Sequence, residues 1–228
     1  MSKGKKPPRP LSKATIALNL QLARKRGIRQ LPKRFLIVCE DEKSARDYFD
    51  TLKVHFDLSA ASVEVVGSKG RTQPLQVVER AVDLKEAAEA SNGGTDRFDQ
   101  VWCVIDGDFG TKINNARKKA TANDVKLAIS TKCFEYWVLL HFLENDSATL
   151  DCDGTIHALN RIREKRNFPK YDKGRFDFSR IVADVQEASK RARKLREPQA
   201  ELNIQPENQN PCSEVYLLIE AILNERPG

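Results

Sequence analysis

Short apolar runs alternate with amphipathic stretches between residues 34 and 143. The apolar runs have the length of strands, and they occupy residues 34–40, 62–67, 100–106 and 124–130. The run at 34–40 is continuous, as expected of a strand covered on both faces. The stretches that follow them have helical spacing, and they occupy residues 44–56, 73–90, 111–120 and 133–143. This alternation predicts an α/β fold with about four largely parallel strands, right-handed crossovers and helices on both faces.

The remaining sequence suggests two further parts of the chain. No strand-like run appears after residue 150, where helical patterns cover residues 154–165, 178–196 and 211–224. The N-terminal residues are rich in proline and basic side chains, with a weak amphipathic pattern at 12–26. We therefore expect a flexible or partly helical basic arm at 1–33, an α/β core at 34–150 and a C-terminal helical elaboration of the same domain at 151–228.

The formal charge of +7 is unevenly distributed. Residues 1–34 hold eleven Lys and Arg and no acid, and residues 161–196 hold thirteen Lys and Arg against five acids. Basic segments beside an acidic body suit a carboxylate site that receives a polyanion such as nucleic acid. A disordered basic tail and a solvated lysine-rich helix would give the same composition.

Hydropathy and cysteine spacing bear on the compartment. No apolar run approaches the length of about 18 residues that a membrane-spanning helix needs, and the N-terminal segment has no apolar signal core. The five cysteines form no CxxC pair. We therefore expect a cytoplasmic protein that does not bind membranes, with free thiols and no zinc site.

Acidic residues follow two of the predicted strands. Glu40-Asp41-Glu42 ends the first strand, and Asp106-Gly107-Asp108 ends the third. In a parallel sheet both groups project from the same edge, and carboxylates crowded there repel one another unless a cation lies among them. Oxygen ligands of this kind suit Mg²⁺, for which Mn²⁺ can substitute. The same acids could instead serve as turn residues or helix caps.

Longer segments resemble a known family. A glutamate after the first strand and an Asp-x-Asp after a later one are similar to the metal site of Toprim domains. The segments LIVCEDEKSARDYFDTL, VIDGDF, AISTKCFEYWVLLHF, YDKG and NPCSEVYLLIEAIL resemble the RloB-like family of Toprim-type proteins, in order from about residue 34 to residue 224. The resemblance implies a Toprim-like fold and a Mg²⁺-dependent nuclease of anti-phage defence that works with an ATPase or sensor protein.

The resemblance also assigns roles to residues. Glu40 is expected to be a metal ligand or general base, Asp106 and Asp108 metal ligands, and Glu135 a further ligand or an orienting group. Two positions depart from the family pattern: Asp41 stands where glycine is common, and Thr131-Lys132 stands where Asn-Pro is frequent.

Basic residues near these acids are candidates for contacts with nucleic acid. They are Lys112, Lys118, Lys119, Lys132, Lys173 and Arg175. Each could equally belong to a solvated surface. The substrate could be RNA, including tRNA, or DNA. Because a toxic nuclease needs restraint, a protein partner or a homo-oligomer is also expected.

Two other functions fit the sequence. One is a catalytically silent nucleic-acid-binding subunit, with the acids as turn caps. The other is a receiver-like phosphoacceptor domain built from Asp41, Glu42, Asp106 and Ser130, although no fifth strand with a lysine is present. The histidines show no partner pattern, so histidine-based nuclease chemistry is not expected. Phe134 and Trp137 have core spacing, and Asn210-Pro211 predicts a helix start.

Overall fold

The structure is a computed structural model that describes residues 33–58, 62–91, 95–144, 151–166, 169–205 and 208–225. The basic arm expected at 1–33, with its helix at 12–26, lies outside the described residues except for residue 33. The described residues from Lys33 onward form one compact unit. Within them, no helix combines the length and the apolar character needed to cross a membrane.

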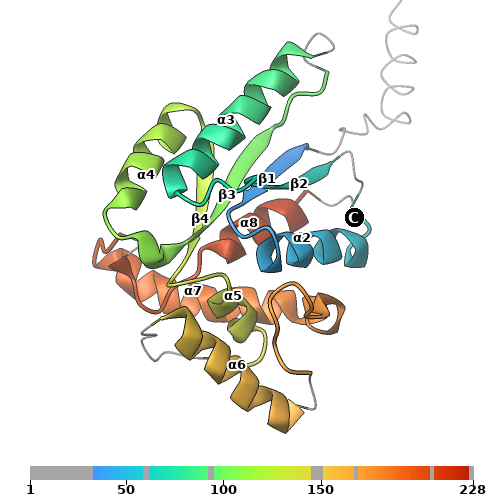
Figure 1. The fold of residues 1–228 in the computed structure, drawn as a ribbon, viewed down its shortest axis with the longest axis vertical. Coiled ribbons are helices and arrows are strands. Elements are labelled where there is room, and N and C mark those ends of the chain that lie inside the picture. The colour runs from blue at the N-terminus through green and yellow to red at the C-terminus, as the bar shows by residue number, and fades with distance from the viewer. Residues whose placement is uncertain are drawn as a thin grey trace, which may run out of the picture. The chain divides into compact units, whose positions relative to one another are not determined.

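Four parallel strands form the central sheet, which confirms the predicted α/β class (Figure 1). They are β1 (Phe35–Cys39), β2 (Val63–Gly67), β3 (Gln100–Asp106) and β4 (Val125–Ser130). Their order in the sheet is β2-β1-β3-β4, and every pairing is parallel. The chain therefore steps from β1 to β2 in one direction and returns past β1 to reach β3. This reversal makes the β1–β3 junction a topological switch point.

Helices cover both faces of the sheet because right-handed crossovers in opposite directions lie on opposite faces. One face carries α3 (Pro74–Ala90) and α4 (Lys112–Ala122). The other carries α2 (Ser44–His55), α5 (Glu135–Leu140), α7 (Val185–Glu201) and α8 (Val215–Leu223). In β1, Leu36 and Val38 join the first core, whereas Phe35, Ile37 and Cys39 join the second. Burial on both faces explains why the central strands β1 and β3 are continuous apolar runs, whereas the edge strands β2 and β4 each contain an exposed charged residue.

The helices after residue 150 share the core of the α2 face. Val185 of α7 and Ile219 of α8 are buried in the same hydrophobic cluster as Trp137 of α5. Helix α6 (Cys152–Arg166) packs against α5. Short 3-10 turns at Phe178–Arg180 and Val182–Asp184 precede α7, and α5 is shorter than the sequence pattern suggested.

The expectation that Pro211 begins a helix is wrong. The Asn210–Pro211 peptide bond is cis, and α8 begins at Val215. The intervening residues instead lie beside the end of β4, where Ser213 forms an antiparallel bridge with Ser130. The Thr131 amide donates to the Cys212 carbonyl at 2.7 Å. Backbone pairing of this segment with β4, which a local sequence pattern does not reveal, delays the helix by four residues.

Gly107 is required by a close approach between two loops at this sheet edge. A Cβ atom at Gly107 would lie 2.7 Å from the carbonyl oxygen of Ser130 and 3.2 Å from the Cα of Thr131. Both neighbours are backbone atoms, so neither can rotate away as a side chain would. The glycine therefore permits the turn after β3 to pack on the end of β4.

We expect Gly107→Ala to lower the free energy of unfolding by about 1–3 kcal/mol, because the added methyl group must displace backbone. Urea denaturation would measure this change. Gly154→Ala is a suitable control, because the added Cβ would lie 3.1 Å from Asp151 Oδ1, a side-chain atom that can move. Equal stability of Gly107→Ala and the wild type would show that the two loops are not held together as described.

Candidate active site

Neighbouring strands bring the acidic residues together at the switch point. Strands β1 and β3 pair directly, with Cys39 opposite Val104. The Glu40 amide extends this ladder by donating to the Val104 carbonyl at 3.0 Å. The Asp106 amide in turn donates to Glu40 Oε2 at 3.2 Å. The Glu40 carboxylate therefore lies against the start of the Asp106-Gly107-Asp108 turn.

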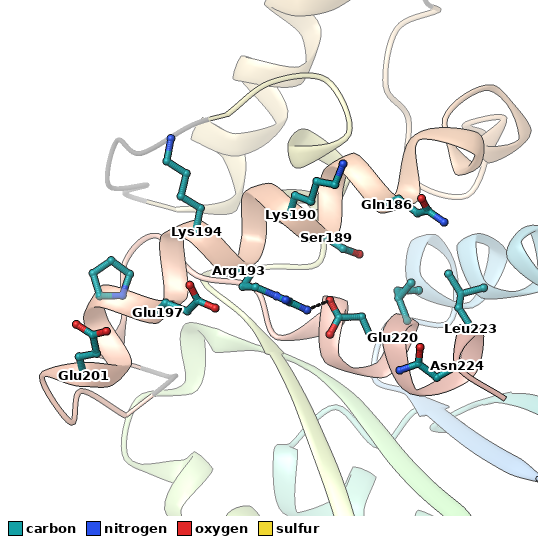
Figure 2. A pocket seen from close by; sticks show the side chains of 12 residues that line it. Gln186, Ser189, Lys190, Arg193, Lys194, Glu197, Glu201, Glu220, Leu223 and Asn224 are labelled. Atoms are coloured by element: carbon teal, nitrogen blue, oxygen red, sulfur yellow. Dashed lines mark hydrogen bonds and ion pairs between the residues drawn. The ribbon is translucent and has the colours of Figure 1, made fainter.

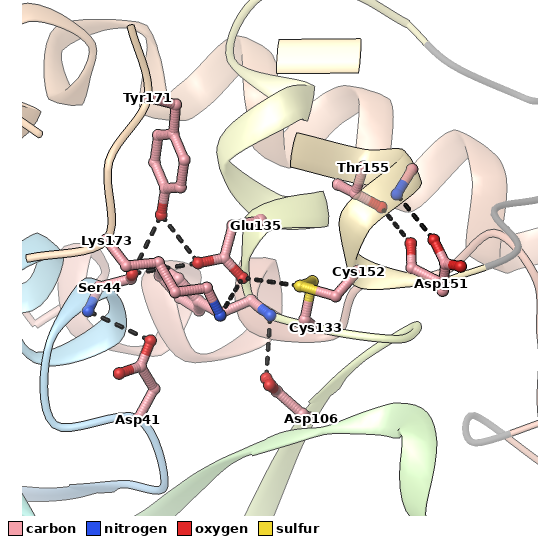
Figure 3. The surroundings of a disulfide bond; sticks show 12 residues. Asp41, Ser44, Asp106, Cys133, Glu135, Asp151, Cys152, Thr155, Tyr171 and Lys173 are labelled. Atoms are coloured by element: carbon pink, nitrogen blue, oxygen red, sulfur yellow. Dashed lines mark hydrogen bonds and ion pairs between the residues drawn. A yellow bond between two sulfur atoms is a disulfide. The ribbon is translucent and has the colours of Figure 1, made fainter. Parts of the chain in front are cut away.

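Asp106 and Asp108 differ in their surroundings. Asp106 Oδ1 accepts a hydrogen bond from the Phe134 amide at 2.9 Å, which ties the end of β3 to the segment before α5 (Figure 3). Asp108 belongs to the 3-10 turn Gly107–Phe109, and its side chain is exposed. One aspartate is thus held in place by the fold, and the other faces solvent.

The electrostatics of the cluster show that its carboxylates are crowded. Burial raises the pKa of Glu40 from 4.5 to about 7, and the charges of Asp108 and Asp41 act in the same direction. Burial raises the pKa of Asp106 well above its ordinary value, with further contributions from Glu40 and Glu135. The ionised form of both groups is therefore costly unless a cation lies beside them. A divalent cation beside them would relieve this cost, so the donor set fits Mg²⁺ or Mn²⁺.

Glu135 is fully buried, and its hydrogen-bond and ion-pair partners are Ser44, Tyr171 and Lys173 (Figure 3). Its Oε1 accepts hydrogen bonds from Tyr171 Oη at 2.9 Å and from Ser44 Oγ at 3.1 Å. Its Oε2 forms an ion pair with Lys173 Nζ at 3.2 Å. These partners come from α2 and from the segment before the 3-10 turns. A buried carboxylate is stable only with such partners, so Glu135 joins three parts of the chain.

Lys173 supplies positive charge to the acidic cluster. Burial by itself would lower the pKa of Lys173, but the ion pair and hydrogen bond with Glu135, together with the charges of Asp41 and Asp106, raise it. The same ammonium group lowers the pKa of Glu40 and of Asp106. Its side chain keeps 40 % of its surface exposed, so Lys173 contacts both the cluster and solvent.

Asp41 and Glu42 bind backbone groups beside the cluster. The Asp41 carboxylate accepts from the amides of Lys43 at 2.8 Å and Ser44 at 3.2 Å, at the start of α2. Glu42 Oε1 accepts from the Gly70 amide at 2.9 Å, in the loop after β2. The carboxylate at position 41 thus binds backbone amides at the start of α2. These contacts argue against the receiver-like alternative, which needs both acids at the metal.

The predicted basic residues lie at different distances from the carboxylates. Lys132 lies in the turn just before α5, with a positive φ of 65°. Lys112 begins α4, where its Nζ donates to Gln73 Oε1 at 3.3 Å beside a pocket of about 230 Å³. Lys118 and Lys119 are exposed and lie roughly 10 Å further along α4, which runs back toward the opposite edge of the sheet. Arg175 is exposed, two residues after Lys173.

The basic stretch 190–196 on α7 faces acidic residues. Lys190 pairs with Glu187, and Arg193 pairs with Glu220 across a groove of about 690 Å³ between α7 and α8 (Figure 2). Arg196 Nη2 lies 3.1 Å from the buried carboxylate of Glu214. These pairs offset much of the local positive charge. The high count of Lys and Arg in the sequence therefore overstates how basic this surface is.

His141 and its neighbours form part of the core, as their spacing suggested. His141 Nε2 lies 3.0 Å from Tyr48 Oη, and its Nδ1 lies 3.0 Å from the Trp137 carbonyl. Burial lowers the pKa of His141 to about 4, so its ring is neutral near pH 7. Phe134 and Trp137 are also buried.

The expectation of five free thiols is wrong for two cysteines. Cys133 and Cys152 form a disulfide with a Cα–Cα distance of 5.6 Å, and the Cys152 sulfur lies 3.4 Å from Glu135 Oε2 (Figure 3). The free cysteines are buried at positions 39, 103 and 212. Pairing arises because α6 begins beside the segment that leads into α5, a tertiary contact that cysteine spacing does not encode.

Comparison with known proteins identifies the family. The family model described as RloB-like protein matches residues 35–222. The chain belongs to the RloB-like protein family. No curated protein and no solved structure matches the chain.

Segments that carry the RloB-like pattern lie close together in the fold. The segment before α5, which contains Cys133, follows β4, and the segment before α8 runs beside the end of the same strand. Ser130 Oγ and Ser213 Oγ lie 2.7 Å apart, and Thr131 Oγ1 donates to the Gln209 carbonyl at 2.6 Å. Ser44 and Tyr171 belong to the candidate site but were not among the predicted site residues. The signal for Tyr171 was its place beside Lys173 in the YDKG segment.

The raised pKa of Glu40 predicts a pH-dependent stability. Its contribution to stability is fully present below about pH 4.5 and is lost as the pH rises through about 7, because ionisation of the folded state is costly. Glu40→Gln should therefore become more stable than the wild type over this interval, by about 2 kcal/mol near pH 7.5. Chemical denaturation in EDTA from pH 4 to pH 8 would measure the difference.

Glu64→Gln is the matched control for this measurement, because Glu64 is exposed on β2. It makes the same substitution away from the carboxylate cluster. A difference between Glu40→Gln and the wild type that stays constant from pH 4 to pH 8 would contradict the electrostatic description of the site.

Proposed function

We propose that this RloB-like protein is a Mg²⁺-dependent Toprim-type nuclease that hydrolyses phosphodiester bonds in RNA or DNA as part of anti-phage defence. The observation that carries the proposal is the convergence of Glu40, Asp106 and Asp108 at the ends of two neighbouring parallel strands. The raised pKa of Glu40 and Asp106 supports the proposal, because a cation beside them would relieve the cost of their ionisation. Membership of the family supports the same reading.

Glu40, Asp106 and Asp108 would hold the ion, and Mn²⁺ could replace Mg²⁺. Their donors are all oxygen, as these cations prefer, and exposed Asp108 leaves a side open to substrate. A bound ion would supply positive charge that polarises a phosphodiester group and favours ionisation of an attacking water. Glu135 would act beside them, either as a further ligand through Oε2 or as the group that positions Lys173.

The protein's own residues would supply the remaining chemistry. Glu40, whose pKa lies near neutral, is suited to accept a proton from the attacking water. Lys173 extends from the cluster toward solvent, where its ammonium group would attract a phosphate oxygen and stabilise the negative charge that develops in the reaction. Buried Glu135 would hold Lys173 in place and so fix the position of its ammonium group.

Nucleic acid would approach along the carboxyl edge of the sheet. Lys112, Lys132, Lys173 and Arg175 belong to the segments around this edge and would contact phosphates. Lys118 and Lys119 lie further along α4 and would contact a more distant part of a long substrate. Both RNA, including tRNA, and DNA present the phosphates that such residues recognise.

The cellular role follows from the family resemblance. A nuclease of anti-phage defence would act in the cytoplasm and would be restrained by an ATPase or sensor protein, or within a homo-oligomer. The alternative function is a catalytically silent nucleic-acid-binding subunit. The hydrogen bonds and ion pair of Glu135 favour that alternative, because they already satisfy the carboxylate.

Asp106→Asn tests catalysis with little change of fold. Asparagine keeps an oxygen acceptor for the Phe134 amide but removes the negative charge from the cluster. We expect cleavage to fall at least about a hundredfold. The assay incubates purified protein with labelled single-stranded DNA, duplex DNA and total tRNA, in Mg²⁺, Mn²⁺ or EDTA.

Asp83→Asn is the matched control, because Asp83 is exposed on α3 and pairs with Arg71. It should cleave like the wild type. Cleavage that persists in Asp106→Asn combined with Asp108→Ala, or that continues in EDTA, would overturn the proposed metal mechanism. If the wild type neither cleaves nor binds Mn²⁺ in calorimetry, the silent-subunit alternative holds.

Lys173→Met and Lys118→Met compare two basic residues at different distances from the carboxylates. Lys173→Met should abolish most cleavage and also destabilise the protein, because it leaves buried Glu135 without its cationic partner. Lys118→Met should reduce nucleic-acid affinity modestly. The slope of log affinity against log salt concentration should fall by the amount expected for about one lost phosphate contact. Fluorescence anisotropy at several salt concentrations would measure the nucleic-acid affinity of each variant and its salt dependence. The cleavage assay described above would measure activity. Equal loss of cleavage in Lys173→Met and Lys118→Met would contradict the assignment of Lys173 to the carboxylate cluster and of Lys118 to a more distant surface.

A further inference from the structure

The disulfide of Cys133 and Cys152 lies against the buried carboxylate of the candidate site. Cys133 precedes α5 by two residues, and Cys152 begins α6. Their sulfur atoms and a carboxylate oxygen of Glu135 lie within 4.8 Å of one another. Chemistry at this pair therefore occurs in direct contact with Glu135.

The two cysteines differ in accessibility. Cys152 is partly exposed, whereas Cys133 is buried. The cysteines at positions 39, 103 and 212 are buried as well, and burial raises the pKa of each of their thiols, which makes them poor nucleophiles. Among the cysteines of the described residues, Cys152 is thus the one a reagent in solution reaches, and Cys133 lies beside it as a resolving partner.

We propose that Cys133 and Cys152 form a reversible thiol–disulfide exchange site for low-molecular-weight thiols and disulfides, and that its state sets the availability of the Glu135 carboxylate to a cation. The thiol–disulfide exchange does not depend on whether the protein is a nuclease. The effect on cation binding by Glu135 rests on the proposed function.

Oxidation of the dithiol proceeds in two balanced exchanges. The Cys152 thiolate attacks one sulfur of a small disulfide, forms a mixed disulfide and releases one small thiol, which takes up the proton that Cys152 lost. The Cys133 thiolate then attacks the Cys152 sulfur and releases the second small thiol. Two protein thiols lose two electrons, and one small disulfide gains them. Two molecules of a small thiol reverse the process.

Reduction changes the surroundings of Glu135 Oε2. In the disulfide, the Cys152 sulfur carries no hydrogen, so its 3.4 Å contact with Oε2 is not a hydrogen bond, and Lys173 is the polar partner of this oxygen. In the dithiol, the Cys152 thiol can donate to Oε2. This added donor competes with a cation, and the covalent link between the starts of α5 and α6 is lost. We therefore expect Mn²⁺ affinity to be about three- to tenfold lower in the reduced protein.

The test equilibrates the full-length protein in glutathione buffers that range from fully reduced to strongly oxidised. Free thiols are trapped by alkylation, and mass spectrometry of the peptides measures the state of Cys133 and Cys152. Mn²⁺ affinity is measured by calorimetry for the oxidised and reduced forms of the wild type, Cys152→Ala and Cys133→Ser. Cys212→Ala is the control, because it removes a buried free cysteine elsewhere in the fold.

Support requires that the pair interconverts as one unit across the buffers, and that Mn²⁺ affinity changes with its state in the wild type and Cys212→Ala but not in Cys152→Ala. A pair that stays reduced in every buffer, or one that no thiol reduces without unfolding, would overturn the exchange site. Interconversion with unchanged Mn²⁺ affinity would overturn the link to Glu135.

A further arm adds Zn²⁺ to the reduced protein. Stoichiometric Zn²⁺ binding that is lost in Cys152→Ala and that blocks oxidation would replace the exchange site by a metal site of Cys133, Glu135 and Cys152. Interconversion of the thiols in a protein that binds no Mn²⁺ in either state would support the exchange site and count against the proposed metal centre.

Discussion

Direct pairing of β1 with β3 is the constraint on which the candidate site depends. Because the two strands are parallel neighbours, the residues that follow them leave the sheet at the same edge. Glu40 and Asp106 are therefore brought close enough for the amide of one to donate to the carboxylate of the other. The cost of this arrangement is desolvation and, to a smaller extent, repulsion between the carboxylates, and both raise the pKa of the two groups. Gly107 makes it sterically possible by letting the turn pack against the end of β4.

Glu135 links the acidic edge of the sheet to the helices that pack on it. Its fully buried carboxylate collects donors from α2 and from the segment that carries Tyr171 and Lys173. Under the proposed function, stability and metal binding would compete at Glu135, because the partners that make its burial tolerable also satisfy the oxygens that a metal would use. The sulfur atom of Cys152, which belongs to the disulfide, also contacts Oε2 of this carboxylate.

The sequence predicted the central strands well, because burial of β1 and β3 on both faces leaves continuous apolar runs with clear ends. It also predicted the acidic edge, since strand direction alone decides where Glu40 and Asp106 project. Contacts between distant segments were not predictable in this way. Ser44 and Glu135 are 91 positions apart, and a bond between them depends on how α2 packs on α5. Pairing of Cys133 with Cys152 and the late start of α8 likewise follow from tertiary packing.

The segment that leads into α8 affects whether two copies of the protein can associate through β4. Strand β4 lies at an edge of the sheet, and such strands offer unpaired backbone groups to any extended chain. Here Cys212 accepts from Thr131, and the Glu214 amide donates to Ile129, so the end of β4 is already covered by the protein's own backbone. Sheet extension between two copies at this end of β4 would require that segment to be displaced, which protects the edge beside the carboxylates from strand-mediated aggregation.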